Sequence, residues 1–266
     1  MRIKLLNNVY IMKKKFLYLG FVAVLVLMAS CAKHYQMESV SRSRMLIDSR
    51  YDAQPDAKAM AFLAPYKQTV DSVMGPVVGR AGSYLAAERP ESKLSNLLAD
   101  IMVWAGKRYG ETVSFAVYNI GGIRASFAEG DVTIGDVLDV APFENKICFF
   151  DMTGEKVREL FEQIAKRGGE GVSSGVRLRI SADGRLLSAL IDGKEVDPAA
   201  TYRVTTLDYL AEGNDQMTAF KAKTNLNSPG GPKDNTRELI MDYFREQQKL
   251  GKVVDSQVEG RVVVEN

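Results

Sequence analysis

A glycine turn with an arginine at its exit is the first feature of this sequence that could bind a ligand. It lies in the stretch YNIGGIRASFAEGDVTIGDVLDVAPFENK, which runs from Tyr118 to Lys146. Glycines let backbone amides approach a ligand closely, and the planar guanidinium of Arg124 can hold a carboxylate or phosphate with two hydrogen bonds. Asn119, at the start of the turn, can both donate and accept. The turn therefore suits an anionic ligand, and a surface salt bridge is the alternative role for Arg124.

Two aromatic residues at the ends of predicted elements form a second candidate feature. Phe143 follows a proline in the corner PFEN, and Tyr209 follows a predicted strand in LDYLAEGND. Two such rings can hold a planar base between them, and the stacking contributes roughly 1–3 kcal/mol per base. Asp215, which ends the second stretch, is a good acceptor for ribose hydroxyls. Core packing is the alternative for each ring, and sequence spacing leaves their relative position open.

The residue types of the chain exclude several kinds of catalytic site. Its one histidine, His34, lies in a polar N-terminal segment, which excludes a serine–histidine triad and a histidine-rich dimetal site. Cys148 has no histidine to activate it, and its place in the apolar run ICFF indicates a buried structural thiol. The segment GGEGVSSG, residues 168–175, lacks the lysine and the helix context of a phosphate-binding loop, so it is interpreted as a helix end and strand entry. A magnesium site built from carboxylates alone stays open, although no acidic cluster is evident.

The N-terminal segment is typical of a bacterial lipoprotein signal peptide. Lysines at 13–15 precede an apolar run from Phe16 to Met28, and small residues lead to Cys31. We expect residues 1–31 to be a signal peptide that ends at the lipidated Cys31 and residues 32–55 to be a flexible tether. The protein would then be lipid-anchored in the bacterial cell envelope, periplasmic or surface-exposed. A signal anchor with an incidental cysteine is the alternative, although the apolar run is short for a spanning helix.

The charge of the chain disfavours nucleic acid as a partner. Residues 1–30 hold five basic and no acidic residues, out of 35 basic and 33 acidic residues in the whole chain. The rest therefore has 30 basic and 33 acidic residues, a net charge of −3. No basic surface for nucleic acid is expected. If Cys31 is acylated, Cys148 has no disulfide partner.

Helical and alternating patterns are mixed along the chain, which predicts an α+β fold with a single domain after the tether. Helices are expected over residues 56–74, 92–109, 133–140, 155–166 and 236–250. Strands are expected over residues 77–79, 113–118, 146–152, 176–180, 186–191, 202–207 and 261–264. A polar loop is expected over residues 225–234. The glycine turn and the two aromatic residues all fall at ends of these elements.

Three stretches, ESKLSNLLADIM, the glycine-turn stretch and LDYLAEGNDQM, resemble three ordered motifs of the C-terminal domain of the secreted 5′-nucleotidase and UDP-sugar hydrolase family. The family motifs typically read ESNLGNLIADAM, then NGGGIR followed by GDVLEVLPFGN, then a strand-end aromatic followed by a GGDG turn. Order and rough spacing match, and the resemblance covers residues 56–266. It implies a 5′-nucleotidase C-terminal-like domain with mixed sheets and packed helices, in which residues 56–74 form a connector helix.

In that family the domain binds the nucleoside part of the substrate. Carried over by position, the resemblance implies that Asn119 and Arg124 belong to the turn that faces the ligand, and that Arg89 lies near the position of a further phosphate-directed arginine. The substrate-binding residues implied by the resemblance are Asn119, Arg124, Phe143, Gly175, Tyr209 and Asp215. Phe143 and Tyr209 correspond to the stacking aromatics, Gly175 to a glycine at the base edge, and Asp215 to the ribose-binding aspartate.

This sequence departs from the family pattern at several turns. Ile120 replaces a glycine, Glu144 adds a negative charge where a phosphate-bearing ligand is expected, and Asn214 and Gln216 replace glycines. Gln216 tolerates left-handed backbone poorly. The family's N-terminal metallophosphatase domain, with its histidine- and aspartate-rich motifs, has no counterpart in this sequence. We therefore expect no cofactor and no catalytic residue in this chain, and divalent metals only in a partner metallophosphatase.

These observations leave several functions open. The leading hypothesis is the nucleotide- or nucleoside-recognition half of a 5′-nucleotidase, which acts with a separately encoded metallophosphatase in nucleotide catabolism. The second is a stand-alone nucleoside- or nucleotide-binding lipoprotein, and the third is a scaffold whose substituted turns no longer bind. A hydrolase activity of the chain itself, through an unrecognised site, is the least favoured.

Overall fold

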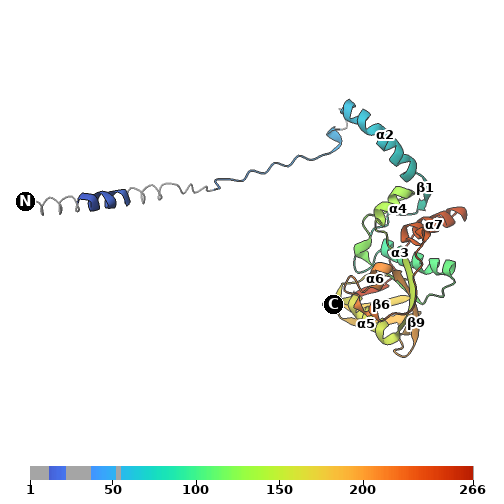
Figure 1. Cartoon of the computed structure of the whole chain (residues 1–266). Helices are drawn as coiled ribbons and strands as arrows, with labels where there is room; N and C mark the ends of the chain where they lie inside the picture. The colour runs from blue at the N-terminus through green and yellow to red at the C-terminus, as the bar shows by residue number, and fades with distance from the viewer. Residues whose placement is uncertain (1–11, 22–36, 52–54, 266) are drawn as a thin grey trace, which may run out of the picture. The chain divides into compact units, whose positions relative to one another are not determined.

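The computed structural model describes residues 12–21, 37–51 and 55–265, and it divides the chain into two compact units, Met1–Asp56 and Ala57–Asn266 (Figure 1). The first unit contains a helical segment over residues 12–21 and the 3-10 turn η1 (Ser49–Tyr51). The expected lipidation site, Cys31, and the single histidine, His34, lie outside the described residues. None of the helices in the described parts of the chain is long and apolar enough to cross a membrane.

The second unit mixes helices and strands (Figure 1). Its helices are α2 (Ala57–Met74), α3 (Lys93–Gly106), α4 (Ile134–Val140), α5 (Gly154–Lys166), α6 (Asp208–Ala211) and α7 (Thr236–Lys249). Its strands are β1 (Val77–Ala81), β2 (Phe115–Tyr118), β3 (Gly130–Thr133), β4 (Ile147–Thr153), β5 (Gly171–Val172), β6 (Val176–Ser181), β7 (Leu186–Ile191), β8 (Lys194–Glu195), β9 (Thr201–Leu207), β10 (Thr224–Asn227) and β11 (Val262–Glu265). The α+β fold expected from the sequence is confirmed.

The strands form one central sheet and two smaller ones. The five-stranded sheet has the order β10-β4-β9-β2-β5, in which β2 runs parallel to β9 and the other pairs are antiparallel. The four-stranded sheet has the order β11-β6-β7-β8, and β1 pairs with β3 in a separate two-stranded sheet. Because β2 and β9 are parallel neighbours, the turn after β2 and the turn after β9 lie at the same edge of the central sheet. That edge carries the candidate site.

Local sequence signals explain why the helices form where they do. Ser92 caps α3 in a capping box with Ser95, and Thr133 caps α4 in a capping box with Asp136. Thr153 caps α5 by accepting a hydrogen bond from the backbone of Lys156. Each cap satisfies backbone N–H groups that would otherwise have no partner at the start of the helix.

Helix α5 buries its apolar face against the central sheet. Its buried residues at helical spacing are Val157, Leu160, Phe161 and Ile164, all 0% exposed. The Phe161 ring lies 5.3 Å from the Phe115 ring of β2, measured between centroids. Burial of each such side chain contributes about 1.5–3 kcal/mol relative to leaving it exposed. The helix therefore holds the β2 end of the sheet, and with it the turn that follows β2.

Helix α2 differs from the other long helices because none of its residues is buried. The apolar positions that predicted it, among them Met60, Leu63 and Val70, are more than half exposed. The periodicity therefore predicts the helix correctly, but its apolar side chains are not buried in any core that the described residues form. Pro65 lies inside the helix.

Several expected boundaries differ from the structure, and two of these differences have a clear cause. The helix expected over 92–109 ends as an α-helix at Gly106 and continues as a 3-10 turn to Tyr109, before Gly110 adopts a left-handed conformation. The loop expected over 225–234 begins inside β10, which pairs with β4 at the edge of the sheet. The sequence TNLN of β10 is polar and shows no burial pattern, because an edge strand exposed on one side has little need of alternating apolar residues.

Candidate functional site

One cavity of about 280 Å³ collects aromatic, polar and charged side chains from separate segments of the chain. We call it the aromatic cavity. It is lined by Asn119, Gly121, Gly122, Phe143, Asn145, Arg167, Tyr209 and Asp215. Its volume lies just below the range of small-molecule sites, which is on the order of 300–1,000 Å³. The lining mixes two exposed rings with a few polar groups, which is the composition that such sites usually have.

The first wall is the turn that follows β2. Asn119 is the N-cap of the 3-10 turn Ile120–Gly122 (η3), and its side chain is 4% exposed. A Cβ atom on Gly122 would lie 2.7 Å from Asn119 Oδ1, so this close approach requires glycine at position 122. Asn119 Oδ1 is the one buried side-chain oxygen or nitrogen of the described residues without a hydrogen-bond partner. Such an acceptor costs about 1–3 kcal/mol when unsatisfied, and here it belongs to a residue that lines a cavity.

The second wall is the turn after α6, which carries Asp215. Asp215 and Gln216 have φ values of 53° and 63°, the left-handed region that non-glycine residues rarely adopt. Asp215 Oδ2 accepts a hydrogen bond from Asn119 Nδ2 at 2.8 Å, and Oδ1 accepts one from the Tyr209 hydroxyl at 3.0 Å. The first of these bonds joins residues 96 positions apart in the sequence. It ties the turn after β2 to the turn after α6.

The two aromatic residues line the same cavity and remain accessible. Phe143 is 48% exposed and Tyr209 is 42% exposed, so both rings keep surface that a ligand in the cavity could contact. The hydrogen bond to Asp215 raises the pKa of the Tyr209 phenol, because a nearby carboxylate disfavours the phenolate. The core-packing alternative therefore does not describe either ring.

Four of the six implied substrate-binding residues line this cavity, namely Asn119, Phe143, Tyr209 and Asp215. The other two, Arg124 and Gly175, are not among its lining residues. Arg124 is exposed, and its Nη1 donates to the Gly121 carbonyl at 3.3 Å, so it borders the turn from outside. Gly175 precedes β6, where an added Cβ would meet Asp192 Oδ1 at 2.5 Å.

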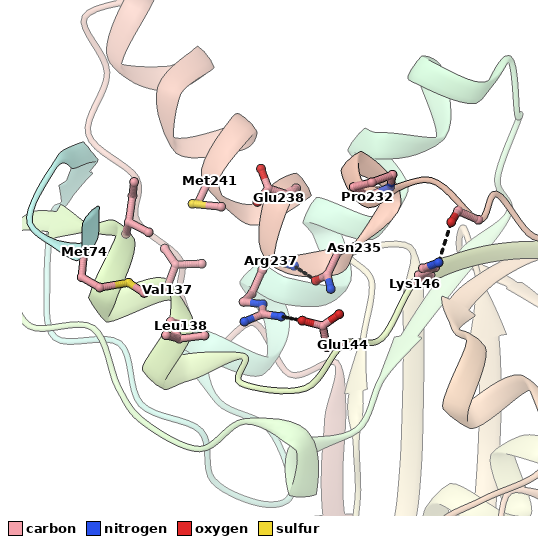
Figure 2. Close-up of a pocket in the computed structure, with 12 residues that line it drawn as sticks. Met74, Val137, Leu138, Glu144, Lys146, Pro232, Asn235, Arg237, Glu238 and Met241 are labelled. Carbon is pink, nitrogen blue, oxygen red and sulfur yellow. Dashed lines mark hydrogen bonds and ion pairs between the residues drawn. The ribbon is translucent and has the colours of Figure 1, made fainter. Parts of the chain in front are cut away.

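Glu144 faces a different cavity from its neighbours Phe143 and Asn145. Its Oε1 accepts a hydrogen bond from Arg237 Nη2 at 2.8 Å (Figure 2). Glu144 therefore does not line the aromatic cavity, and its expected effect on a phosphate-bearing ligand stays a prediction. Alternate residues of the corner line different cavities, as alternate side chains of an extended segment do.

The second cavity lies between α4 and α7 and has a volume of about 490 Å³. We call it the α4–α7 cavity. Apolar residues of α4 and α7 and the end of α2 form one part of it, and Figure 2 shows Met74, Val137, Leu138 and Met241 there. Three of its four charged side chains are engaged, since Arg237 contacts Glu144 and Lys146 Nζ donates to the Gly230 carbonyl at 2.5 Å. The fourth, Glu238, lies in the first turn of α7, and its side chain has no hydrogen bond or ion pair among the described residues.

Sequence reasoning missed three residues at or behind the aromatic cavity. Asn145 lines it beside Phe143, and Arg167 reaches it from the C-terminal end of α5. Glu170 lies behind it, with a side chain that is 0% exposed, and binds Arg167 and Arg89. Arg89 is therefore engaged with Glu170 instead of lining the cavity. The only sequence signal for Arg167 and Glu170 was their charge on either side of Gly168-Gly169, and this glycine pair is typical of a helix end.

The described residues do not fit a dimetal centre. Among them, no group of three or more histidine, cysteine, aspartate or glutamate side chains is placed to hold a metal ion. The buried thiol offers no nucleophile either, since burial raises the pKa of Cys148 to about 12. We therefore derive no metal-dependent or thiol-dependent step from these side chains. The cavity has the means to hold a ligand by stacking and hydrogen bonds.

Comparison with known proteins points to one family. The family described as "5′-nucleotidase, C-terminal domain" matches residues 70–222. The chain is 30% identical over 249 residues to the "Trifunctional nucleotide phosphoesterase protein YfkN" of Bacillus subtilis (strain 168), covering 85% of this chain and 16% of that protein. It is 29% identical over 159 residues to "Protein UshA" of Escherichia coli (strain K12), covering 59% of this chain and 29% of that protein.

A solved structure shares the fold of the second unit. It is the 5′-nucleotidase precursor from Thermus thermophilus, with a TM-score of 0.68 and 31% sequence identity. The match covers 81% of this chain and 45% of that one. The chain thus spans less than half the length of each of these three relatives.

Proposed function

This chain belongs to the 5′-nucleotidase C-terminal domain family, and we propose that it binds the base and ribose of a nucleotide or nucleoside in the aromatic cavity. A metallophosphatase on a separate polypeptide would hydrolyse the 5′-phosphate. The chain would then be the recognition half of a 5′-nucleotidase that acts in nucleotide catabolism. The names of the relatives, which include nucleotide phosphoesterases and 5′-nucleotidases, support a nucleotide ligand.

The observation that carries this proposal is the convergence of two exposed rings with a carboxylate and an amide in one cavity. A base between Phe143 and Tyr209 would gain roughly 1–3 kcal/mol from stacking. Asp215 carries acceptors for ribose hydroxyls, and Asn119 Oδ1 is a buried acceptor without a partner. These groups are suited to recognition, and none of them is a nucleophile with an adjacent base.

The separate catalytic partner is supported by residue types and by one exposed surface. The 266 residues contain a single histidine, so the metal ligands of a dimetal phosphatase would come from outside them. The divalent metals of the reaction would accordingly be bound by the partner. Helix α2 offers a surface for a protein partner, since Met60, Leu63 and Val70 are each more than half exposed.

The cellular location follows from the N-terminal sequence alone. We propose that the protein is a lipoprotein of the bacterial cell envelope, anchored through Cys31, which follows the apolar run and small residues of a signal peptide. The polar segment 32–55 would let the domain reach a ligand or partner away from the membrane surface. Mass spectrometry of the mature N-terminus tests the anchor, because an acylated Cys31 would be the first residue.

The function is tested by calorimetric titration of the full chain, purified in detergent, with adenosine and with AMP in the absence of metal. We expect both ligands to bind and AMP to remain unhydrolysed. Phe143→Ala and Tyr209→Ala should each weaken binding by about tenfold or more, from the loss of one stacking surface. Tyr84→Ala is the matched control, because Tyr84 is 63% exposed and lies outside the cavity lining.

The other hypotheses give different results in the same experiment. No binding at millimolar ligand would reject the recognition function for the isolated chain and favour the scaffold. Binding without any stimulation of AMP hydrolysis by co-expressed metallophosphatases would favour a stand-alone binding lipoprotein. Hydrolysis of AMP by the purified chain would contradict the division of labour proposed here.

A further inference from the structure

A buried carboxylate lies directly behind the aromatic cavity. The Glu170 side chain is 0% exposed, and its Oε2 accepts a hydrogen bond from the Ile120 backbone N–H at 2.6 Å. Its Oε1 accepts hydrogen bonds from Arg167 Nε at 2.6 Å and from Arg89 Nη2. A buried charge is tolerated only when it is paired and hydrogen-bonded. Glu170 meets this condition with groups from three separate segments, one of which is the turn that begins at Asn119.

Arg167 connects this carboxylate to the cavity. Its side chain is 18% exposed and lines the aromatic cavity, and its Nη2 lies 3.6 Å from Asp215 Oδ2. Its Nε donates to Glu170, which orients the planar guanidinium so that Nη2 is the atom near Asp215. Arg167 is therefore a cation placed beside the carboxylate to which the proposed function assigns the ribose hydroxyls.

These contacts form a closed chain of interactions beside Asp215. Glu170 accepts a hydrogen bond from the Ile120 amide, and the adjacent Asn119 donates one to Asp215 Oδ2. Arg167 pairs with the same Oδ2 and donates a hydrogen bond to Glu170. These interactions join the turn after β2, the turn after α6 and the end of α5. A ligand would then meet a carboxylate whose direction is set before binding, which lowers the ordering cost of binding.

We propose that Arg167, held by the buried Glu170, is a positioning residue that fixes the Asp215 carboxylate and thereby sets how strongly the cavity selects ligands that carry ribose hydroxyls. This inference rests on the proposed function of the cavity. A carboxylate selects hydroxyls only when its lone pairs are aimed at them. The Tyr209 hydroxyl donates to Oδ1 of Asp215, and Asn119 Nδ2 donates to Oδ2. The Arg167 cation lies 3.6 Å from the same Oδ2 and adds a charge that holds this oxygen in place.

The structure indicates which substitution isolates this role. Removing Glu170 would leave two arginines beside a buried pocket and endanger folding. Removing Arg167 leaves Glu170 paired with Arg89 and with the Ile120 N–H. Arg167→Met keeps most of the apolar stem and removes the charge, so it is the variant of choice. Arg158→Met is the matched control, since Arg158 lies in α5, of which Arg167 is the C-cap, is 62% exposed and pairs with Glu162.

The experiment compares adenosine with 2′,3′-dideoxyadenosine, by calorimetric titration of the full chain in detergent. We expect the wild-type chain and Arg158→Met to prefer adenosine. Arg167→Met should bind adenosine about tenfold more weakly, the size expected when hydrogen bonds to a charged group lose their geometry. Its affinity for the dideoxy ligand should change by less than about twofold. Arg167→Lys should recover part of the preference, since its single ammonium can reach Glu170 or Asp215 but provides no planar fork.

Other outcomes overturn the inference. Equal weakening of both ligands in Arg167→Met would mean a general structural role, and unchanged affinities would mean no role. If Arg167→Met does not fold, the test rests on Arg167→Lys alone. A preference for adenosine over the dideoxy ligand equal to that of the wild type would overturn the positioning role. A reduced preference, with the affinity for the dideoxy ligand unchanged, would support it. A wild-type chain that binds neither ligand rejects the proposed function itself, and this inference with it.

Discussion

The two cavities on either side of the corner Pro142–Lys146 share one short segment yet differ in what their side chains leave unsatisfied. Phe143 and Asn145 face the aromatic cavity, and Glu144 and Lys146 face the α4–α7 cavity. The larger cavity, about 490 Å³, has three of its four charged side chains engaged within the protein, and none of its lining residues is aromatic. The smaller one, about 280 Å³, has exposed rings and an unpartnered buried acceptor. Polar atoms without partners and exposed aromatic rings, more than volume, distinguish a ligand site from a surface hollow.

Backbone conformation sharpens the contrast. Asp215 and Gln216, at the aromatic cavity, adopt the left-handed conformation without being glycine, and none of the described residues that line the α4–α7 cavity does so. Such positions cost about 1–2 kcal/mol per residue and persist only where surrounding contacts hold them. The hydrogen bonds from Asn119 and Tyr209 to Asp215 are contacts of this kind.

The largest expected effect separates the two cavities by their acidic residues. Asp215→Ala removes the acceptor of two protein hydrogen bonds and the proposed ribose contact, so adenosine affinity should fall by about 30-fold or more. Glu144→Ala removes only a partner of Arg237 at a side chain that is 87% exposed, so affinity should change by less than about twofold. Calorimetric titration measures both, and a larger loss in Glu144→Ala would reverse the assignment of the site.

A smaller effect concerns the strained turn. Gln216→Gly should raise the free energy of unfolding by about 0.5–1 kcal/mol, because relief of left-handed strain outweighs the extra freedom of glycine in the unfolded chain. The control is Gln248→Gly on the exposed side of α7, which should lower the same quantity by about 1 kcal/mol. Urea unfolding at fixed pH compares them. Destabilisation by Gln216→Gly would show that the glutamine side chain supports the turn.

The smallest effect is a pH dependence at the aromatic cavity. Because the hydrogen bond to Asp215 raises the pKa of Tyr209, the stability from this pair is fully present below the unfolded tyrosine pKa of about 10 and is lost as pH rises through the folded pKa. The wild-type chain should therefore lose stability more steeply above about pH 10 than Tyr209→Phe does. Urea unfolding between about pH 8 and 11, on either side of that pKa, measures how the free energy of unfolding changes with pH. Identical slopes for the wild-type chain and Tyr209→Phe would contradict the hydrogen bond between Tyr209 and Asp215.

Local sequence signals predicted most of the secondary structure, and for physical reasons that act over a few residues. Capping at Ser92 and Thr133 and the helical spacing on α5 depend on neighbours within one or two turns. One exception is β10, whose pairing partner β4 is distant in the sequence. Its polar composition carries no periodicity to detect.

For the candidate site, the sequence by itself determined the residue types that can stack, accept and donate, and it excluded histidine-based chemistry through a single histidine outside the second unit. Only the tertiary structure decided which of them meet. In the folded chain Asn119 donates to Asp215, Glu144 pairs with Arg237, and Gly175 lies next to Asp192 and does not line the aromatic cavity. The tertiary structure also brought Arg167 and the buried Glu170 to the cavity. The physical reason is that burial and pairing depend on the packing of segments far apart in the sequence, which no local spacing encodes.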